Sequence, residues 1–206
     1  MAEIRVKETG TIKLFESDNT SSVTIASPAS LGADRTITLP DGDVTLVAGT
    51  MSTSDGITVA DQWRLTTSFT GDANPIASNL EQIDTTGQGT IGSAMTESSG
   101  VFTFPSTGIY YVKFNVQFSF NGDARFLESA ISVASTKVAH EYTFVDNGGE
   151  GGTTYTYVSV DTLVDCDDTS VDTVKFSVSM SNQGVLCSAD TDKNTTSMTF
   201  IRLGDT

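Results

Sequence analysis

Large apolar side chains occupy every second position from Tyr110 to Phe120, and polar side chains fill most of the positions between them. A period of two predicts a β-strand with one face buried. We expect the face that begins at Tyr110 to lie in a core and Tyr111 to point the opposite way. A Pro- and Gly-containing turn at 105–108 separates this strand from a shorter one at 101–104.

The rest of the C-terminal region shows the same kind of pattern in shorter runs. Together with the two strands above, this predicts about eight strands, which suits a two-sheet jelly roll. The stretch 72–90 is irregular, and 146–152 is a polar, Gly-rich loop. The remaining strands are expected at 62–70, 125–134, 137–145, 154–164, 173–179 and 198–203.

Residues 1–50 form a different region, with alternating runs of four to six residues closed by turns. About 45 residues of this kind make a poor independent core, so we expect this region to be stabilised by other chains. A Gly/Ser/Thr-rich stretch at 51–60 reads as a linker, and 61–206 as a second domain. The candidate contact residues of the first region are Leu14, Val23, Ile25, Ile37 and Leu39.

Composition supports an all-β chain. Hydrophobic residues make up 37% of the 206 residues, and Thr, Ser and Gly are abundant, which favours strands and turns over helices. The net charge of −15 repels nucleic-acid backbones and anionic membranes. No apolar stretch approaches the length of a membrane span, and residues 1–10 show no signal-peptide hydrophobic region. We therefore expect no nucleic-acid partner and no membrane span.

The residue types that carry chemistry are sparse. His140 is the only histidine, and no Gly-x-Ser-x-Gly turn accompanies it, so we expect a strand histidine and no enzyme. Cys166 and Cys187 lie near the ends of what read as neighbouring strands. A bridge between them is conceivable, but two reduced thiols are favoured.

A run of acidic residues at 161–172 is the one candidate for a cofactor. Carboxylate oxygens are the ligands that calcium prefers, and Asp165, Asp167 and Asp168 are the candidate ligands. The spacing is not that of an EF-hand. A solvated acidic loop is the favoured interpretation, and we expect no cofactor.

The order Phe-Pro, Gly turn, Tyr-Tyr and long aromatic strand at 104–120 resembles the globular head of the C1q and tumour-necrosis-factor (TNF) families. The resemblance covers roughly 61–206 and implies a homotrimeric jelly roll. In a monomer the second face of the inner sheet would leave an exposed apolar patch, which usually marks an interface. The candidate residues for this trimer interface are Ile109, Tyr111, Ile201 and Leu203.

A second resemblance lies in 23–47, where Arg35-Thr36-Ile37-Thr38-Leu39-Pro40-Asp41-Gly42 is followed by Leu46-Val47. This segment is similar to one in fibre and appendage proteins of tailed bacteriophages, where it lies in the stalk or near the virion attachment end. It implies a virion structural protein, a short trimeric fibre or decoration spike of head or tail, whose base contacts other virion proteins.

The loops of the knob are the candidate contacts with a host surface, and their candidate residues are Asp123, Arg125, Asn147 and Glu150. The alternative hypothesis is a carbohydrate-binding module with the same knob, which would recognise a host glycan.

Overall fold

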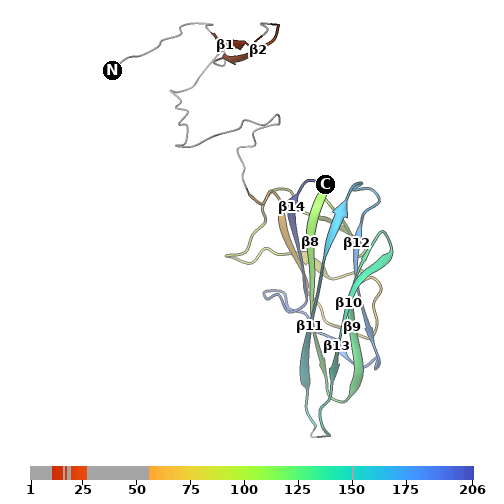
Figure 1. Cartoon of the computed structure of the whole chain (residues 1–206). Helices are drawn as coiled ribbons and strands as arrows, with labels where there is room; N and C mark the ends of the chain where they lie inside the picture. Colours follow the sequence, from red (N-terminus) through yellow and green to blue (C-terminus); the bar gives the residue numbers. More distant parts are fainter. Residues whose placement is uncertain (1–10, 16, 18–19, 27–55, 150) are drawn as a thin grey trace. The chain divides into compact units, whose positions relative to one another are not determined.

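The computed structural model describes residues 11–15, 17, 20–26, 56–149 and 151–206 (Figure 1). The chain divides into two compact units, Met1–Thr50 and Met51–Thr206, which are described separately below. Every regular element in the described residues is a β-strand, which confirms the all-β prediction. Within these residues, no helix is long and apolar enough to cross a membrane.

The described part of the first unit is a single antiparallel hairpin. Strand β1 (Thr11–Phe15) pairs with β2 (Ser22–Ala26), with Ile12 opposite Ile25 and Leu14 opposite Val23. An isolated two-stranded hairpin is at best marginally stable in water. That other chains stabilise this region stays a prediction.

The second unit contains two antiparallel sheets. In the larger sheet the hydrogen-bonded order is β4-β13-β8-β14-β3-β5, and β11 pairs with the other edge of β8. Figure 1 shows β14, β8 and β11 side by side along the unit. The strands of this sheet are β3 (Ala60–Leu65), β4 (Phe69–Thr70), β5 (Leu80–Gln82), β8 (Gly108–Phe120), β11 (Thr154–Cys166), β13 (Leu186–Cys187) and β14 (Ser197–Gly204).

The smaller sheet has the order β10-β9-β12-β7-β6 and packs over the core face of the larger one. Its edge strand β10 lies beside β11, where the hydroxyls of Thr143 and Thr156 are 2.8 Å apart. Its strands are β6 (Thr96–Ser98), β7 (Val101–Thr103), β9 (Ala124–Val133), β10 (Thr136–Val145) and β12 (Val174–Met180).

The alternation along β8 builds the core. Tyr110, Val112, Phe114, Val116 and Phe118 are all fully buried, as predicted. They meet aromatic rings of the smaller sheet: the ring centroid of Phe114 is 5.0 Å from that of Phe176 on β12. Phe176 in turn packs edge-to-face against Phe102 on β7, with ring centroids 5.4 Å apart. Such edge-to-face pairs are favourable because the ring edge is positive and the face negative.

The long strands were predictable, and the short ones were not. Strands β4, β5, β6 and β13 have two or three residues each, too few to show a period. The prediction of an irregular 72–90 was wrong at β5, which pairs with β3 through Leu65 and Leu80. The predicted strand at 62–70 is divided into β3 and β4.

The two ends of the second unit carry different parts of the chain. At one end Ile201 of β14 pairs with Ala60 of β3, so the chain enters and leaves there. At the other end Phe120 of β8 pairs with Thr154 of β11, and the β8–β9 and β10–β11 loops follow. Figure 1 shows the C-terminus and the β10–β11 loop at opposite ends.

Candidate functional site: an apolar sheet face and a set of distal loops

The outer face of the larger sheet carries a cluster of apolar side chains near the end where the chain leaves. Tyr111 on β8 pairs with Leu163 on β11 and with Ile201 on β14, so the three side chains form one row across the sheet. Ile109 lies two residues from Tyr111 on the same face, and Leu203 lies two residues beyond Ile201. We call Ile109, Tyr111, Leu163, Ile201 and Leu203 the apolar patch.

The apolar patch is open to solvent in the single chain. Leu163 is 63% exposed and Leu203 56% exposed, and the other three members are partly buried. Burial, followed by the negative charge of nearby Asp161, raises the pKa of the Tyr111 phenol. Contiguous exposed apolar side chains on a soluble protein usually mark an interaction surface.

A polar row bounds the apolar patch on one side. Lys113 pairs with Asp161 on β11 and with Thr199 on β14, directly beside the Tyr111 row. The next row on the same face holds Asn115 and Ser159. The outer face is therefore apolar at one end of the sheet and polar along its middle.

The structure brings together all four residues that the sequence suggested for an interface. Ile109, Tyr111 and Ile201 follow from plain alternation, whereas Leu203 lies inside a register shift between Arg202 and Gly204. Sequence reasoning missed Leu163. The sequence did carry a signal for its face, because Tyr155, Tyr157 and Leu163 all occupy odd positions of one strand. The pairing of this strand with Tyr111 could not be predicted from the sequence.

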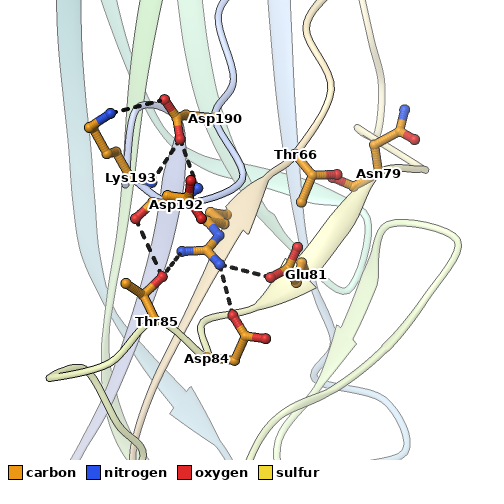
Figure 2. A network of polar contacts seen from close by, with 9 residues as sticks. Thr66, Asn79, Glu81, Asp84, Thr85, Asp190, Asp192 and Lys193 are labelled. Atoms are coloured by element: carbon orange, nitrogen blue, oxygen red, sulfur yellow. Dashed lines mark hydrogen bonds and ion pairs between the residues drawn. The ribbon is translucent and has the colours of Figure 1, made fainter.

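A buried arginine network covers another part of the same outer face. Arg64 on β3 pairs with Ser197 on β14, which pairs with Asn115 on β8, so Arg64 lies on the outer face. It is nevertheless only 1% exposed. Its Nη1 donates to Thr85 Oγ1 at 2.7 Å, and its Nη2 donates to Glu81 Oε1 at 2.8 Å and to Asp84 Oδ1 at 2.9 Å. Figure 2 shows these acceptors meeting one guanidinium group.

The loop before β14 closes the network from the other side. Thr85 Oγ1 also donates to the Asp192 carbonyl at 3.3 Å, and Asp190 accepts from the backbone N–H groups of Asp192 and Lys193. The bond from the Asp192 N–H is the largest cause of the lowered pKa of Asp190. The network thus covers the β3 and β5 side of the face and leaves the apolar patch open on the β8, β11 and β14 side.

The hairpin of the first unit presents apolar side chains of its own. Ile12 and Ile25 face each other across the ladder, and they are 46% and 53% exposed. Leu14 is 57% exposed and pairs with Val23. Three attachment candidates, Leu14, Val23 and Ile25, therefore lie on one hairpin, and Ile37 and Leu39 lie outside the described residues.

The distal loops are tied to one another by side-chain hydrogen bonds. Asp123 Oδ1 accepts from the backbone N–H of Asn147 at 3.0 Å, and Asn121 Oδ1 accepts from that of Gly152 at 3.1 Å. Arg125 is exposed beside a groove lined by Asp123, Phe144 and Asp146. The structure therefore brings the loop candidates Asp123, Arg125 and Asn147 to one end, and Glu150 lies outside the described residues.

The calcium candidates do not converge. Asp165 lies on the outer face of β11 opposite Ile109, while Asp168 Oδ1 accepts from the backbone N–H and the hydroxyl of Ser170. These two bonds lower the pKa of Asp168. Within the described residues, no group of three or more His, Cys, Asp or Glu side chains is placed to hold a metal ion.

Both cysteines are buried free thiols. Cys166 pairs with Gly108 at one end of β8, and Cys187 pairs with Phe118 near the other end. At about 3.3 Å per residue along a strand, that separation far exceeds the roughly 7 Å limit for a disulfide. The expectation that the two cysteines lie on neighbouring strands was wrong, because β8 lies between β11 and β13.

The single histidine lies on the outer face of the smaller sheet. His140 Nδ1 is 3.8 Å from Glu128 Oε1, and its ring centroid is 5.2 Å from that of Tyr142. Half of the His140 side chain is exposed.

Comparison with known proteins identifies the fold of the second unit. No protein-family model and no curated protein sequence matches the chain. Among solved structures, the chain is similar to murine APRIL in a crystal structure at pH 5.0, with 10% sequence identity and a TM-score of 0.51. The likeness covers 70% of this chain and 98% of that chain. The chain therefore contains a TNF-like jelly roll.

Proposed function

We propose that this protein is a homotrimeric structural component of a tailed-bacteriophage virion, a short fibre or decoration spike whose knob is the TNF-like domain. The observation that carries the proposal is the apolar patch on the open outer face of the larger sheet. Trimers are typical of this fold, and closing three such faces around an axis would remove Leu163 and Leu203 from water. Each buried leucine would contribute about 1.5–3 kcal/mol.

The first unit supports an attachment role. Its β1–β2 hairpin exposes Ile12, Leu14 and Ile25, and an isolated two-stranded hairpin is at best marginally stable in water. Contact with another virion protein, or with the same hairpin in other subunits, would cover it. The phage setting itself is an inference from the resemblance of 23–47 to the appendage segment.

The placement of the chain entry and of the loops at opposite ends of the knob supports a display role. The chain enters the second unit at the Ala60 end, and the tied loops around Asn121 and Asn147 lie at the opposite end. A knob held at its entry end would present these loops outward. The proposed role is assembly and presentation, and no catalytic step is part of it.

A carbohydrate-binding module is the second candidate. The observation that favours it is a group of aromatic side chains exposed on β9 and β10, away from the apolar patch: Phe126 is 43% exposed, Tyr142 55% and Phe144 64%. Exposed aromatic rings with polar neighbours are a common composition of ligand sites. This candidate keeps the trimer and changes only what the knob contacts.

Two measurements test the proposal. Light scattering of the full chain after gel filtration should give three times the mass of one 21.7 kDa chain. Mass spectrometry of purified virions, with immunogold electron microscopy using an antibody to the knob, should find the protein at regular sites on the particle. A monomer, or a protein absent from washed virions, would contradict the proposal.

A further inference from the structure

The outer face of the smaller sheet carries an exposed aromatic strip on β9 and β10. Phe126 is 43% exposed and Tyr142 55% exposed, and their rings meet edge-to-face with centroids 6.3 Å apart. His140 continues the strip beyond Tyr142. This face belongs to the sheet opposite the apolar patch, so the proposed trimer contact does not cover it.

A nearly buried carboxylate lies at the foot of the strip. Glu128 is 8% exposed and pairs with Tyr142 across the ladder. Its Oε1 accepts from Lys137 Nζ and lies near His140. The other carboxylate oxygen, Oε2, makes no hydrogen bond within the described residues. It is also not one of the fully buried side-chain atoms that lack a partner there. Glu128 therefore presents one fixed acceptor oxygen to solvent.

Small side chains surround this acceptor. Ser179 on β12 pairs with Glu128, and Ser177 pairs with Ala130, which in turn pairs with His140. Because serine and alanine side chains are short, the aromatic rings stand above the neighbouring strands. The two serine hydroxyls add donors and acceptors beside the rings.

A groove of about 450 Å³ between β10 and β11 adjoins the strip. It is lined by Lys137 and His140 from β10 together with Glu141, and by Ser159 and Asp161 from β11. Lys137 and His140 contribute to both the strip and the groove, so the polar groups continue around the edge of the sheet.

We propose that the strip and its adjoining groove bind a neutral saccharide. A pyranose offers an apolar C–H face that packs on aromatic rings and a rim of hydroxyls for a carboxylate, an ammonium and serines. Glu128, Glu141, Asp161 and the net charge of −15 disfavour anionic sugars. An extended peptide is disfavoured on β9, because both of its edges are already paired with β10 and β12. The role of this site in host contact rests on the proposed function.

The test is binding of the labelled full chain to a panel of immobilised neutral oligosaccharides built from hexoses and N-acetylhexosamines, with sulfated and sialylated counterparts. We expect binding to neutral members and none to their anionic counterparts. Tyr142→Ala and Glu128→Gln should each weaken binding about tenfold or more, with the trimer mass unchanged. Tyr155→Ala, which removes a comparably exposed ring from the other sheet, is the matched control and should bind as the parent does.

Three results would overturn the saccharide site: no binding to any neutral member, binding confined to anionic members, or loss of binding in Tyr155→Ala with retention in Tyr142→Ala. Each of these leaves the trimer and the virion association untouched. Conversely, neutral-saccharide binding by a protein absent from virions would contradict the proposed function and leave the site standing.

Discussion

Tyr111 on β8 stands directly opposite Leu163 on β11, on the face of the sheet that points away from the core. Tyr110, one residue earlier, is fully buried, whereas Leu163 is 63% exposed. One strand thus serves the core with one side and an open apolar row with the other. This pair is where the proposed assembly can be tested most directly.

Tyr111→Asp should convert the trimer to monomers. A charge in a closed apolar interface costs about 3 kcal/mol or more per subunit, whereas the monomer leaves it hydrated. Light scattering measures the mass, and circular dichroism checks the fold. Phe144→Asp, on the other sheet and 64% exposed, is the control and should stay trimeric. A Tyr111→Asp variant that remains a trimer would show that the contact lies elsewhere.

Salt should strengthen the assembly. Three copies of a chain with a net charge of −15 repel one another, and ions screen that repulsion. Raising sodium chloride from about 0.02 M to about 0.5 M shortens the Debye length several-fold and should lower the trimer dissociation constant in sedimentation equilibrium. Weaker association at high salt would instead indicate that ion pairs between subunits hold the assembly together.

Arg64→Lys should destabilise the second unit by about 2–3 kcal/mol. Lysine cannot supply the two nitrogens that reach Thr85, Glu81 and Asp84 at once. Urea unfolding of the full chain measures the change. Lys193→Met removes a cation whose side chain is 80% exposed and should change stability by less than about 0.5 kcal/mol. Equal effects of the two substitutions would argue against a stabilising network.

The thiols should be unreactive in the native protein. Burial raises the pKa of Cys166 to about 11, with help from the carboxylates of Asp172 and its neighbours, and raises that of Cys187 to about 12. Both groups therefore stay protonated at pH 8, and a thiol reagent such as dithionitrobenzoate should label them only after unfolding in urea.

The same shifts set the direction of a pH effect. A thiol whose pKa is raised in the folded protein stabilises the native state fully below the unfolded pKa of 9.0. This stabilisation is lost as the pH rises from 9.0 through the folded pKa values. The urea midpoint should therefore fall between pH 8 and pH 11. Cys187→Ala should reduce that fall. An unchanged pH dependence in this variant would contradict the assignment.

Asn121→Ala should loosen the distal loops with little effect on the rest of the domain. The substitution removes the acceptor for the Gly152 N–H and for the Asn147 amide. Hydrogen exchange should accelerate about tenfold at 147–152, while the global unfolding free energy falls by less than about 1 kcal/mol. Uniform acceleration across β8 and β11 would mean that the loops are coupled to the core.

Patterns within one strand could be predicted from the sequence, and contacts between distant segments could not. The alternation from Tyr110 to Phe120 identified both faces of β8 because each side chain reports on its own strand. Leu163 was missed because its place beside Tyr111 depends on the register of β11 with β8. The Arg64 network was missed because it joins β3 to two loops, near Thr85 and Asp192, that no local pattern connects.

Because the chain enters and leaves at one end of the jelly roll, the distal loops and the apolar row can change independently of each other. The β8–β9 and β10–β11 loops lie far along the strands from the apolar row, so substitutions in them can vary without disturbing the proposed contact between subunits. A foreign peptide inserted among the glycines at 148–152 would be carried outward on an intact scaffold. In the proposed trimer, such a sequence would be displayed in three copies.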